Sequence, residues 1–200
     1  MKELTMQQFI DQVASTDPTK GGGSVSALSG ALGVSLMLMV ARLLRSKNKF
    51  EEYHTTLDEM IDTLDKVSVM FTNFIQQDSE AFDQVMLAFK MPKETETEKL
   101  IRNQAIQQGF LNASFIPLQV MQRVNDVANI SLQLLSLCPP SFKSDAEVGV
   151  LMLNSCFEGA KKNVLINCDS IDDEHQVIQI KNKVDEAAHQ WKYYYNQLNA

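Results

Sequence analysis

Apolar residues recur every three or four positions from about Phe50 to about Phe89. This spacing places them on one face of an α-helix, and a pattern sustained over many turns is typical of a bundle helix. We therefore expect one very long helix here, as part of an all-α fold. The apolar positions are Leu57, Met60, Ile61, Leu64, Val67, Phe71, Phe74, Ile75, Phe82, Val85 and Phe89.

The rest of the chain is also helical in pattern, with short breaks between the segments. Thr5 and Gln8 resemble a capping box and predict a short helix through about Ala14. Further helices are expected from Ser24 to about Lys47, Glu96 to about Leu137, Ser144 or Asp145 to about Asn167, and Asp172 to about Asn199. Pro117 is expected to kink its helix. Residues 1–200 are thus predicted to form a single domain, an elongated bundle of about six helices.

The segment Gly21–Ala41 is uncharged and could be mistaken for a membrane span. Its glycines and serines make it too polar and too small, so we expect a central helix that neighbours approach closely, with no membrane partner. Lys and Arg number 18 against 25 Asp and Glu, without a basic cluster, so no nucleic-acid partner is expected. Three unpaired cysteines and the absence of a signal peptide favour a cytoplasmic location.

Gly21, Gly22, Gly23 and Ser24 precede the main part of this helix. Glycines give the backbone unusual freedom and let another group approach closely. A helix that starts here points unpaired N–H groups into the space beside the glycines, which makes a binding site for an anion. The alternative is a flexible loop in which Ser24 only caps the helix.

Asp78 interrupts the apolar face of the long helix, seven residues after Phe71 and seven before Val85. A carboxylate that faces a bundle core is costly unless it is paired or functional. Burial would raise its pKa towards the range of a general base. The alternative is a buried Asp satisfied by a neighbouring base or N–H group. Ser79 and Glu80 are expected on the solvated surface.

Asn163 and Asn167 lie four residues apart, on one face of an otherwise apolar helix. They bind either a ligand or another helix. Asp145 is explained mainly as a helix start, and it lies about 27 Å along the helix from Asn163, so both cannot touch one small reacting centre from the same chain. No metal is expected, because the histidines have no ligand spacing: His54, His175 and His189.

Several segments, taken together in this order and spacing, resemble a known family. They are Gly-Gly-Gly-Ser-Val-Ser-Ala at 21–27, Asp-Ser-Glu-Ala-Phe at 78–82, Met-Pro-Lys at 91–93, Pro-Leu at 117–118, Ser-Asp at 144–145, Gly-Ala at 159–160 and Asn-Val-Leu-Ile-Asn at 163–167. The chain resembles the formiminotetrahydrofolate cyclodeaminase / methenyltetrahydrofolate cyclohydrolase family over nearly its whole length. The resemblance implies an all-α homodimer with a folate site between helices.

The resemblance also implies a reaction. In a cyclodeaminase, the anilino nitrogen of 5-formiminotetrahydrofolate attacks the formimino carbon, ammonia leaves, and 5,10-methenyltetrahydrofolate remains. The family's catalytic Asp matches Asp78, and the tetrahydrofolate derivative is a substrate rather than a resident cofactor. The expected substrate-binding residues are Gly21, Gly22, Gly23, Ser24, Lys93, Ser144, Asp145, Asn163 and Asn167. A cyclohydrolase, which adds water to the same one-carbon bridge, is the first alternative.

The chain departs from the family pattern at three positions. Lys20 stands where the family usually has Pro, Gln76 replaces an acidic residue, and Pro139 falls near an expected Gly-Asn pair. A non-catalytic helical dimer that has kept the fold, and with it folate binding or only a structural role, is therefore the second class of hypothesis.

Overall fold

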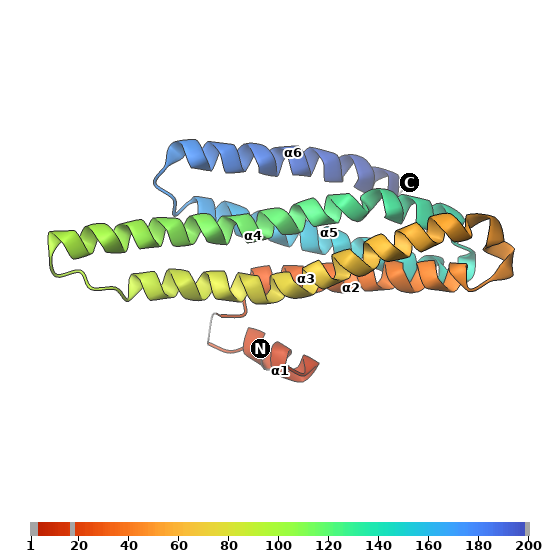
Figure 1. Cartoon of the computed structure of the whole chain (residues 1–200), viewed down its shortest axis with the longest axis horizontal. Coiled ribbons are helices and arrows are strands. Elements are labelled where there is room, and N and C mark those ends of the chain that lie inside the picture. The colour runs from red at the N-terminus through yellow and green to blue at the C-terminus, as the bar shows by residue number, and fades with distance from the viewer. Residues whose placement is uncertain (1–3, 17–18, 199–200) are drawn as a thin grey trace.

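The computed structural model describes residues 4–16 and 19–198 and shows an elongated helical bundle (Figure 1). Its helices are α1 (Met6–Val13), α2 (Gly22–Arg45), η1 (a 3-10 helix, Asn48–Tyr53), α3 (His54–Phe89), α4 (Glu96–Leu137), α5 (Pro140–Cys168) and α6 (Glu174–Leu198). The described residues contain no β-strand, which confirms the predicted all-α fold of about six helices. The predicted end of the last helix near Asn199 lies outside the described residues.

Helix α2 is the centre of the bundle and packs against α3, α4 and α5. A side-chain carbon at Gly30 would lie 2.6 Å or less from the ring of Phe71, and one at Gly33 would lie 2.9 Å from the carbonyl oxygen of Gly149. The small residues thus let the neighbouring helices approach closely, as predicted. By length and composition α2 could also cross a membrane, but half of its apolar window is buried in the bundle, which accounts for its apolar character.

The long helix predicted from Phe50 begins later than expected. Residues 48–53 form η1, and the backbone of Phe50 is not helical, with φ −108° and ψ 21°. The buried Phe50 side chain packs into the core at the end of the bundle and accompanies the reversal from α2 to α3. From His54 the helix then runs unbroken to Phe89, and its predicted apolar face packs against α2 and α4.

The starts of α5 and α6 correct two predictions. Helix α5 begins at Pro140 with Pro139 as its N-cap, so Ser144 and Asp145 lie inside the helix and cap nothing. Proline suits the first position of a helix because its fixed φ is helical and its missing N–H would have no partner there. Helix α6 begins at Glu174 rather than Asp172, because Oδ1 of Asp173 accepts hydrogen bonds from the N–H groups of residues 175 and 176.

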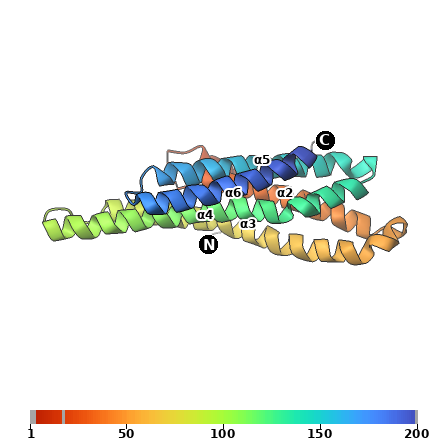
Figure 2. The ribbon, with the colours of Figure 1, turned by 90° about the horizontal axis from the view of Figure 1, so that it is seen from above.

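Helix α6 lies along α4 and α5, as the view from above shows (Figure 2). Its buried Trp191 stacks between Phe157 and Tyr195, and its Nε1 donates a 3.0 Å hydrogen bond to Oδ1 of Asn154. The aromatic side chains and the satisfied indole N–H fix α6 on the bundle.

Helix α1 begins at the predicted capping box of Thr5 and Gln8. It lies apart from the other helices in Figure 1, and none of its residues is buried. Helices α2 to α6 share one hydrophobic core. The single domain over residues 1–200 therefore stays a prediction, because α1 adds nothing to that core.

Candidate active site

A cavity of about 340 Å³ opens beside the N-terminus of α2, where four elements meet. Its size lies within the range of small-molecule sites. Gly21, Gly22 and Gly23 form one edge, and Asp78 of α3 lies beside them. α4 and α5 supply further lining residues, including Asn163 and Asn167. Five of the predicted substrate-binding residues and the predicted catalytic residue thus line one cavity.

Asp78 is held by the start of α2. The hydroxyl of Ser24 donates to Oδ2 of Asp78 at 2.8 Å, and the backbone N–H of Ser24 also hydrogen-bonds this carboxyl group. A side-chain carbon at Gly23 would overlap Oδ1 of Asp78 and lie 2.8 Å from Oδ2. Glycine is therefore required at position 23 because the carboxyl group occupies the space of a Cβ.

This geometry corrects the reason given for the glycines. The helix begins at Gly22 with Gly21 as N-cap, so Ser24 is its third residue and not its cap. None of the described glycines has a positive φ, so close approach, not unusual backbone conformation, explains them. The start of α2 does hydrogen-bond an anionic group, through Ser24, but this group is the carboxylate of Asp78 and belongs to the protein itself.

Burial raises the pKa of the Asp78 carboxyl above its ordinary value. The hydrogen bonds from Ser24 and the charge of Lys20 act in the opposite direction but do not cancel the effect of burial. A carboxylate of this kind is a better base than an exposed one. Ser79, which was expected on the surface, is buried beside Asp78, with its Oγ 3.2 Å from Oγ of Ser24.

The two asparagines of α5 have different partners. Asn163 donates to the carbonyl of Gly159 in its own helix at 2.8 Å and lies against Gly22. Asn167 donates to the carbonyl of Ala113 in α4 at 2.9 Å. Ala113 lies four residues before Pro117, which has no N–H, so this carbonyl has lost its ordinary helical partner. Asn167 therefore compensates for a proline within an unbroken α4 while it lines the cavity.

An apolar wall also lines the cavity. It consists of Phe82, Val85, Met86 and Phe89 of α3, Phe110 of α4 and Ile166 of α5. Met86, Phe89 and Ile166 are 36%, 42% and 64% exposed, so large apolar side chains face solvent around the opening. Such a gathering marks a binding surface. In the sequence, Val85 and Phe89 stand out only as part of a bundle face, Phe82 and Ile166 also fall within segments that carry the family resemblance, and nothing singles out Phe110.

Three predicted binding residues lie elsewhere. Lys93 is exposed in the turn between α3 and α4 and does not line the cavity. Ser144 and Asp145 lie in the first turns of α5, about 27 Å along the helix from Asn163. The structure does not bring these three side chains to Asp78, and their role in binding stays a prediction.

The three residues that depart from the family pattern lie in different parts of the structure. Lys20 lies at the site, where its Nζ donates to Oγ of Ser79 at 2.6 Å. Gln76 hydrogen-bonds Glu80 on the exposed side of α3. Pro139 is the N-cap of α5, at the end far from Asp78. Only Lys20 of the three touches the surroundings of the carboxylate.

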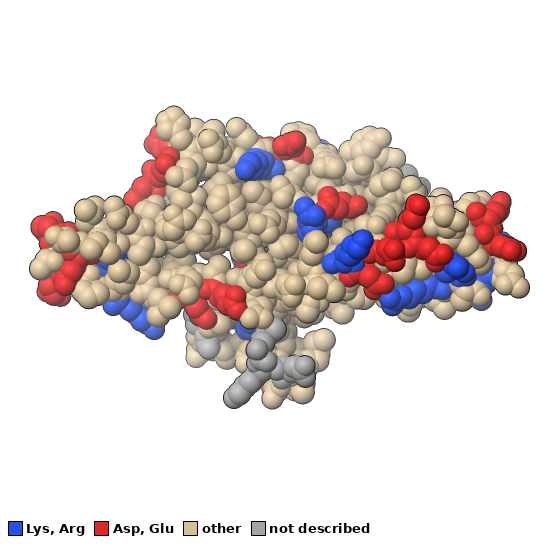
Figure 3. All heavy atoms as spheres, in the orientation of Figure 1, with Lys and Arg blue, Asp and Glu red and all other residues tan. Residues whose placement is uncertain are grey.

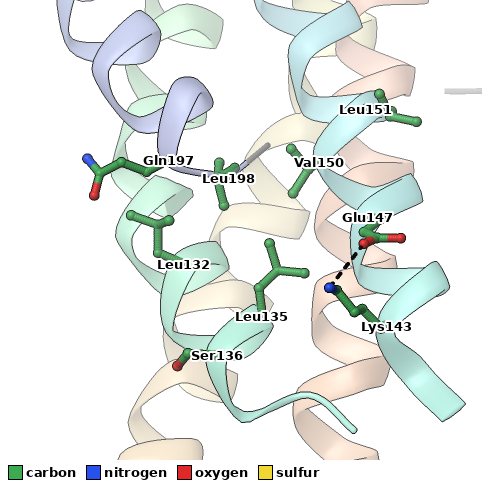
Figure 4. A pocket seen from close by; sticks show the side chains of 9 residues that line it. All are labelled: Leu132, Leu135, Ser136, Lys143, Glu147, Val150, Leu151, Gln197 and Leu198. Carbon is green, nitrogen blue, oxygen red and sulfur yellow. Dashed lines mark ion pairs between the residues drawn. The ribbon is translucent and has the colours of Figure 1, made fainter. Parts of the chain in front are cut away.

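A larger hollow, of about 530 Å³, lies between the C-terminal ends of α4 and α6 and the start of α5 (Figure 4). Its ionised side chains are Lys143 and Glu147, whose 3.8 Å ion pair is exposed at the rim. Its lining residues, all among those that the structure describes, include no carboxylate removed from solvent as Asp78 is. Charged side chains elsewhere gather towards the two ends of the bundle on the face drawn in Figure 3. The smaller cavity is therefore the candidate active site.

Known proteins match this chain over most of its length. The formiminotransferase-cyclodeaminase family model matches residues 5–186, which is most of the chain. The chain belongs to this family. The resemblance inferred from the seven segments is thereby confirmed, and the chain is a member of a folate one-carbon family.

Its relatives are folate-converting enzymes. It is 36% identical over 172 residues to a methenyltetrahydrofolate cyclohydrolase of Methylorubrum extorquens, which covers 84% of this chain and 81% of that protein. It is 30% identical over 180 residues to the formimidoyltransferase-cyclodeaminase of Sus scrofa, covering 90% of this chain but only 33% of that longer protein. The crystal structure of a formiminotetrahydrofolate cyclodeaminase from Thermotoga maritima superposes with a TM-score of 0.87 at 26% identity, covering 98% of this chain and 94% of that one.

Proposed function

We propose that this protein is a formiminotetrahydrofolate cyclodeaminase. The observation that carries the proposal is the Asp78 carboxylate, with its raised pKa, held by Ser24 at the edge of a cavity with an apolar wall. Such a carboxylate can accept and return a proton next to a bound, largely aromatic substrate. The Thermotoga maritima cyclodeaminase, which matches over nearly the whole of both chains, supports the same reaction.

In the proposed reaction, the substrate is bound with its formimino nitrogen protonated. The anilino nitrogen forms a bond to the formimino carbon, the C=N double bond to the protonated nitrogen becomes a single bond, and the anilino nitrogen loses its proton to the Asp78 carboxylate. The tetrahedral carbon then carries an amino group, which accepts that proton and leaves as ammonia. The C–N bond to the amino group breaks, the carbon regains its double-bond character as the methenyl bridge, and Asp78 returns to its ionised form. One carboxylate thus serves as base and acid in turn.

The apolar wall suits the ring systems of a folate. Phe82, Phe89 and Phe110 offer aromatic faces, and Phe89 and Phe110 already pack edge to face, with ring centroids 6.1 Å apart. Asn163 and Asn167 face the cavity from α5 and can orient polar edges of the ligand.

A second candidate is the methenyltetrahydrofolate cyclohydrolase reaction. It is favoured by the relative with 36% identity, which this chain matches over 81% of that protein's length. In that reaction Asp78 would accept a proton from the water that adds to the methenyl carbon. The same carboxylate therefore fits both reactions, and the substrates distinguish them.

The absorbance of the methenyl bridge provides the test. We expect the purified protein to form this absorbance from 5-formiminotetrahydrofolate with release of ammonia. Loss of the absorbance from 5,10-methenyltetrahydrofolate, without turnover of the formimino compound, would instead establish the cyclohydrolase. Turnover of neither substrate would identify the non-catalytic member of the fold and refute both proposals.

We also propose that the protein is a homodimer that pairs through α2 and α5. Val25, Leu32 and Met39 lie seven residues apart on α2 and are 41%, 44% and 39% exposed. Val148 of the adjoining α5 is 45% exposed, and the two helices touch where Oγ of Ser29 donates to a carbonyl of α5 at 2.8 Å. This face is apolar and includes the uncharged part of α2, which favours a second copy of the same face as its partner.

Replacement of Leu32 by Glu should convert the dimer to a monomer in sedimentation velocity at micromolar concentration, because a carboxylate would be buried in the interface. Val69→Glu, at a 61% exposed position of α3, is the matched control and should remain dimeric. A wild-type protein that sediments as a monomer at this concentration would refute the dimer.

A further inference from the structure

Lys20, Ser79, Ser24 and Asp78 form a continuous chain of hydrogen bonds. Nζ of Lys20 lies 2.6 Å from Oγ of Ser79, which lies 3.2 Å from Oγ of Ser24, which in turn lies 2.8 Å from Oδ2 of Asp78. These hydrogen bonds connect Lys20, which precedes α2, with Asp78 and Ser79 of α3, and they pass through Ser24, the third residue of α2. It lies behind the carboxylate, because neither serine nor Lys20 lines the cavity.

The donor and acceptor groups determine the direction of most of these hydrogen bonds. An ammonium group only donates, so Ser79 accepts from Lys20 and its own hydrogen can point to Ser24. An ionised carboxylate only accepts, so Ser24 must donate to Asp78. When Ser79 donates to Ser24, every hydrogen points from Lys20 towards Asp78, and this arrangement stabilises the ionised carboxylate.

The hydroxyl groups of Ser24 and Ser79 also have an alternative hydrogen-bond acceptor. The carbonyl oxygen of Ile75 lies 3.3 Å from Oγ of Ser24 and 3.2 Å from Oγ of Ser79. When Asp78 carries a proton, its hydroxyl can donate to Ser24, and Ser24 can rotate to donate to Ile75. Both protonation states of Asp78 thus have satisfied partners, with the rotation of a single hydroxyl between them.

We propose that Lys20 is a positioning residue which, through Ser79 and Ser24, holds Asp78 in the ionised, proton-accepting state. This inference rests on the proposed role of Asp78 as the proton acceptor. The lining that α4 and α5 contribute to the cavity carries no charge among the described residues, since it consists of Phe110, Ala113, Asn163, Ile166 and Asn167. On α3 itself, Glu80 is exposed and hydrogen-bonded to Gln76. The charge that acts on Asp78 from outside its own helix is that of Lys20.

Lys20→Met tests the proposal, because methionine keeps an unbranched chain but removes the charge and the donors. Two titration midpoints are measured. The first is the pH midpoint of the Asp78 carboxyl carbon signal in the NMR spectrum of the free protein, where the signal is assigned by its absence in Asp78→Asn. The second is the midpoint of the acidic limb of the pH profile of kcat/KM. We expect Lys20→Met to raise both by about 0.5–1 pH unit, because an opposite charge is lost near the carboxylate. Lys20→Arg should restore most of the shift.

Two further variants complete the design. Lys66→Met removes a positive charge from an exposed position of α3 about 18 Å from Asp78 along the helix, and salt screening should keep its shift below about 0.2 unit. Ser79→Ala keeps the charge of Lys20 but removes the hydroxyl that links Lys20 to Ser24. It should shift the NMR midpoint of Asp78 in the same direction as Lys20→Met.

An unchanged NMR midpoint in Lys20→Met, with wild-type circular dichroism, would overturn the proposal. A shift in Lys20→Met without one in Ser79→Ala would show that the charge acts directly and would overturn the role of the serines. If the wild type turns over neither folate, the proposed function fails, whereas the NMR titration still decides whether Lys20 controls the ionisation of Asp78.

Discussion

Replacement of Asp78 by Asn should lower turnover of the folate substrate by about 10²–10⁴-fold, which is the usual contribution of a positioned general base. Asparagine keeps the shape of the side chain and can still accept the hydrogen bond from Ser24, but it cannot take a proton. The measurement is the methenyl absorbance assay under single-substrate conditions. Asp83→Asn, at an exposed position five residues further along α3, is the matched control and should keep wild-type turnover. Wild-type turnover in Asp78→Asn would refute the role of Asp78.

The same variant should be as stable as the wild type at neutral pH, or more stable. The pKa of Asp78 is raised in the fold, so its contribution to stability is fully present below the unfolded value near 3.8 and is lost as the pH rises through the folded pKa. At neutral pH the wild type therefore carries an unfavourable buried charge that Asn removes. Urea unfolding should show the difference shrink as the pH falls towards 4. A wild type that is the more stable protein at neutral pH would contradict the raised pKa.

The fold followed from the sequence because its determinants are local. The apolar spacing from Leu57 to Phe89 and the capping box at Thr5 each depend on residues that are close in sequence. The errors arose at helix starts. The sequence predicts a helix from Ser144 or Asp145, whereas α5 begins at Pro140, because proline suits the first position of a helix. The backbone turn at Phe50 depends on a core that no single segment displays.

The site was predictable where a residue contradicted its own surroundings. Asp78 was visible as a carboxylate on an apolar face, and the glycines before α2 were visible as a run. The sequence did not show that the two belong together, because the space at Gly23 and the carboxylate that fills it are 55 positions apart. Ser79 was misplaced for the same reason: its partners Lys20 and Ser24 come from another part of the chain.

Pro117 and Asn167 illustrate a third case. Each residue was noticed separately, one as a kink and the other as a buried amide. Only the structure shows that Asn167 donates to Ala113, the carbonyl that Pro117 leaves without a helical partner. Of the two alternatives for this amide, the hydrogen bond to another helix is the one observed, and the same bond fixes the Asn167 side chain at the edge of the cavity.

Gly23→Ala should lower turnover by about 10²-fold, because displacement of a catalytic group by about 1 Å can cost that much. The new methyl group would overlap the Asp78 carboxyl, which must move away from Ser24. Overpacking should also cost about 1–3 kcal/mol of stability. Gly22→Ala is the comparison, since its methyl group would lie 3.4 Å from Nδ2 of Asn163, an ordinary contact, and should cost less stability.

A double-mutant cycle separates this explanation from a general intolerance of α2 to alanine. In an Asp78→Ala background the carboxyl group is gone, so the methyl group at position 23 has space and Gly23→Ala should become nearly neutral for stability. Urea unfolding of the four proteins gives the coupling, which for side chains in direct contact is about 0.5–3 kcal/mol. An equal cost of Gly23→Ala in both backgrounds would mean that the glycine serves the helix itself. A cost that disappears with the carboxyl group would mean that position 23 is glycine because Asp78 occupies the space beside it.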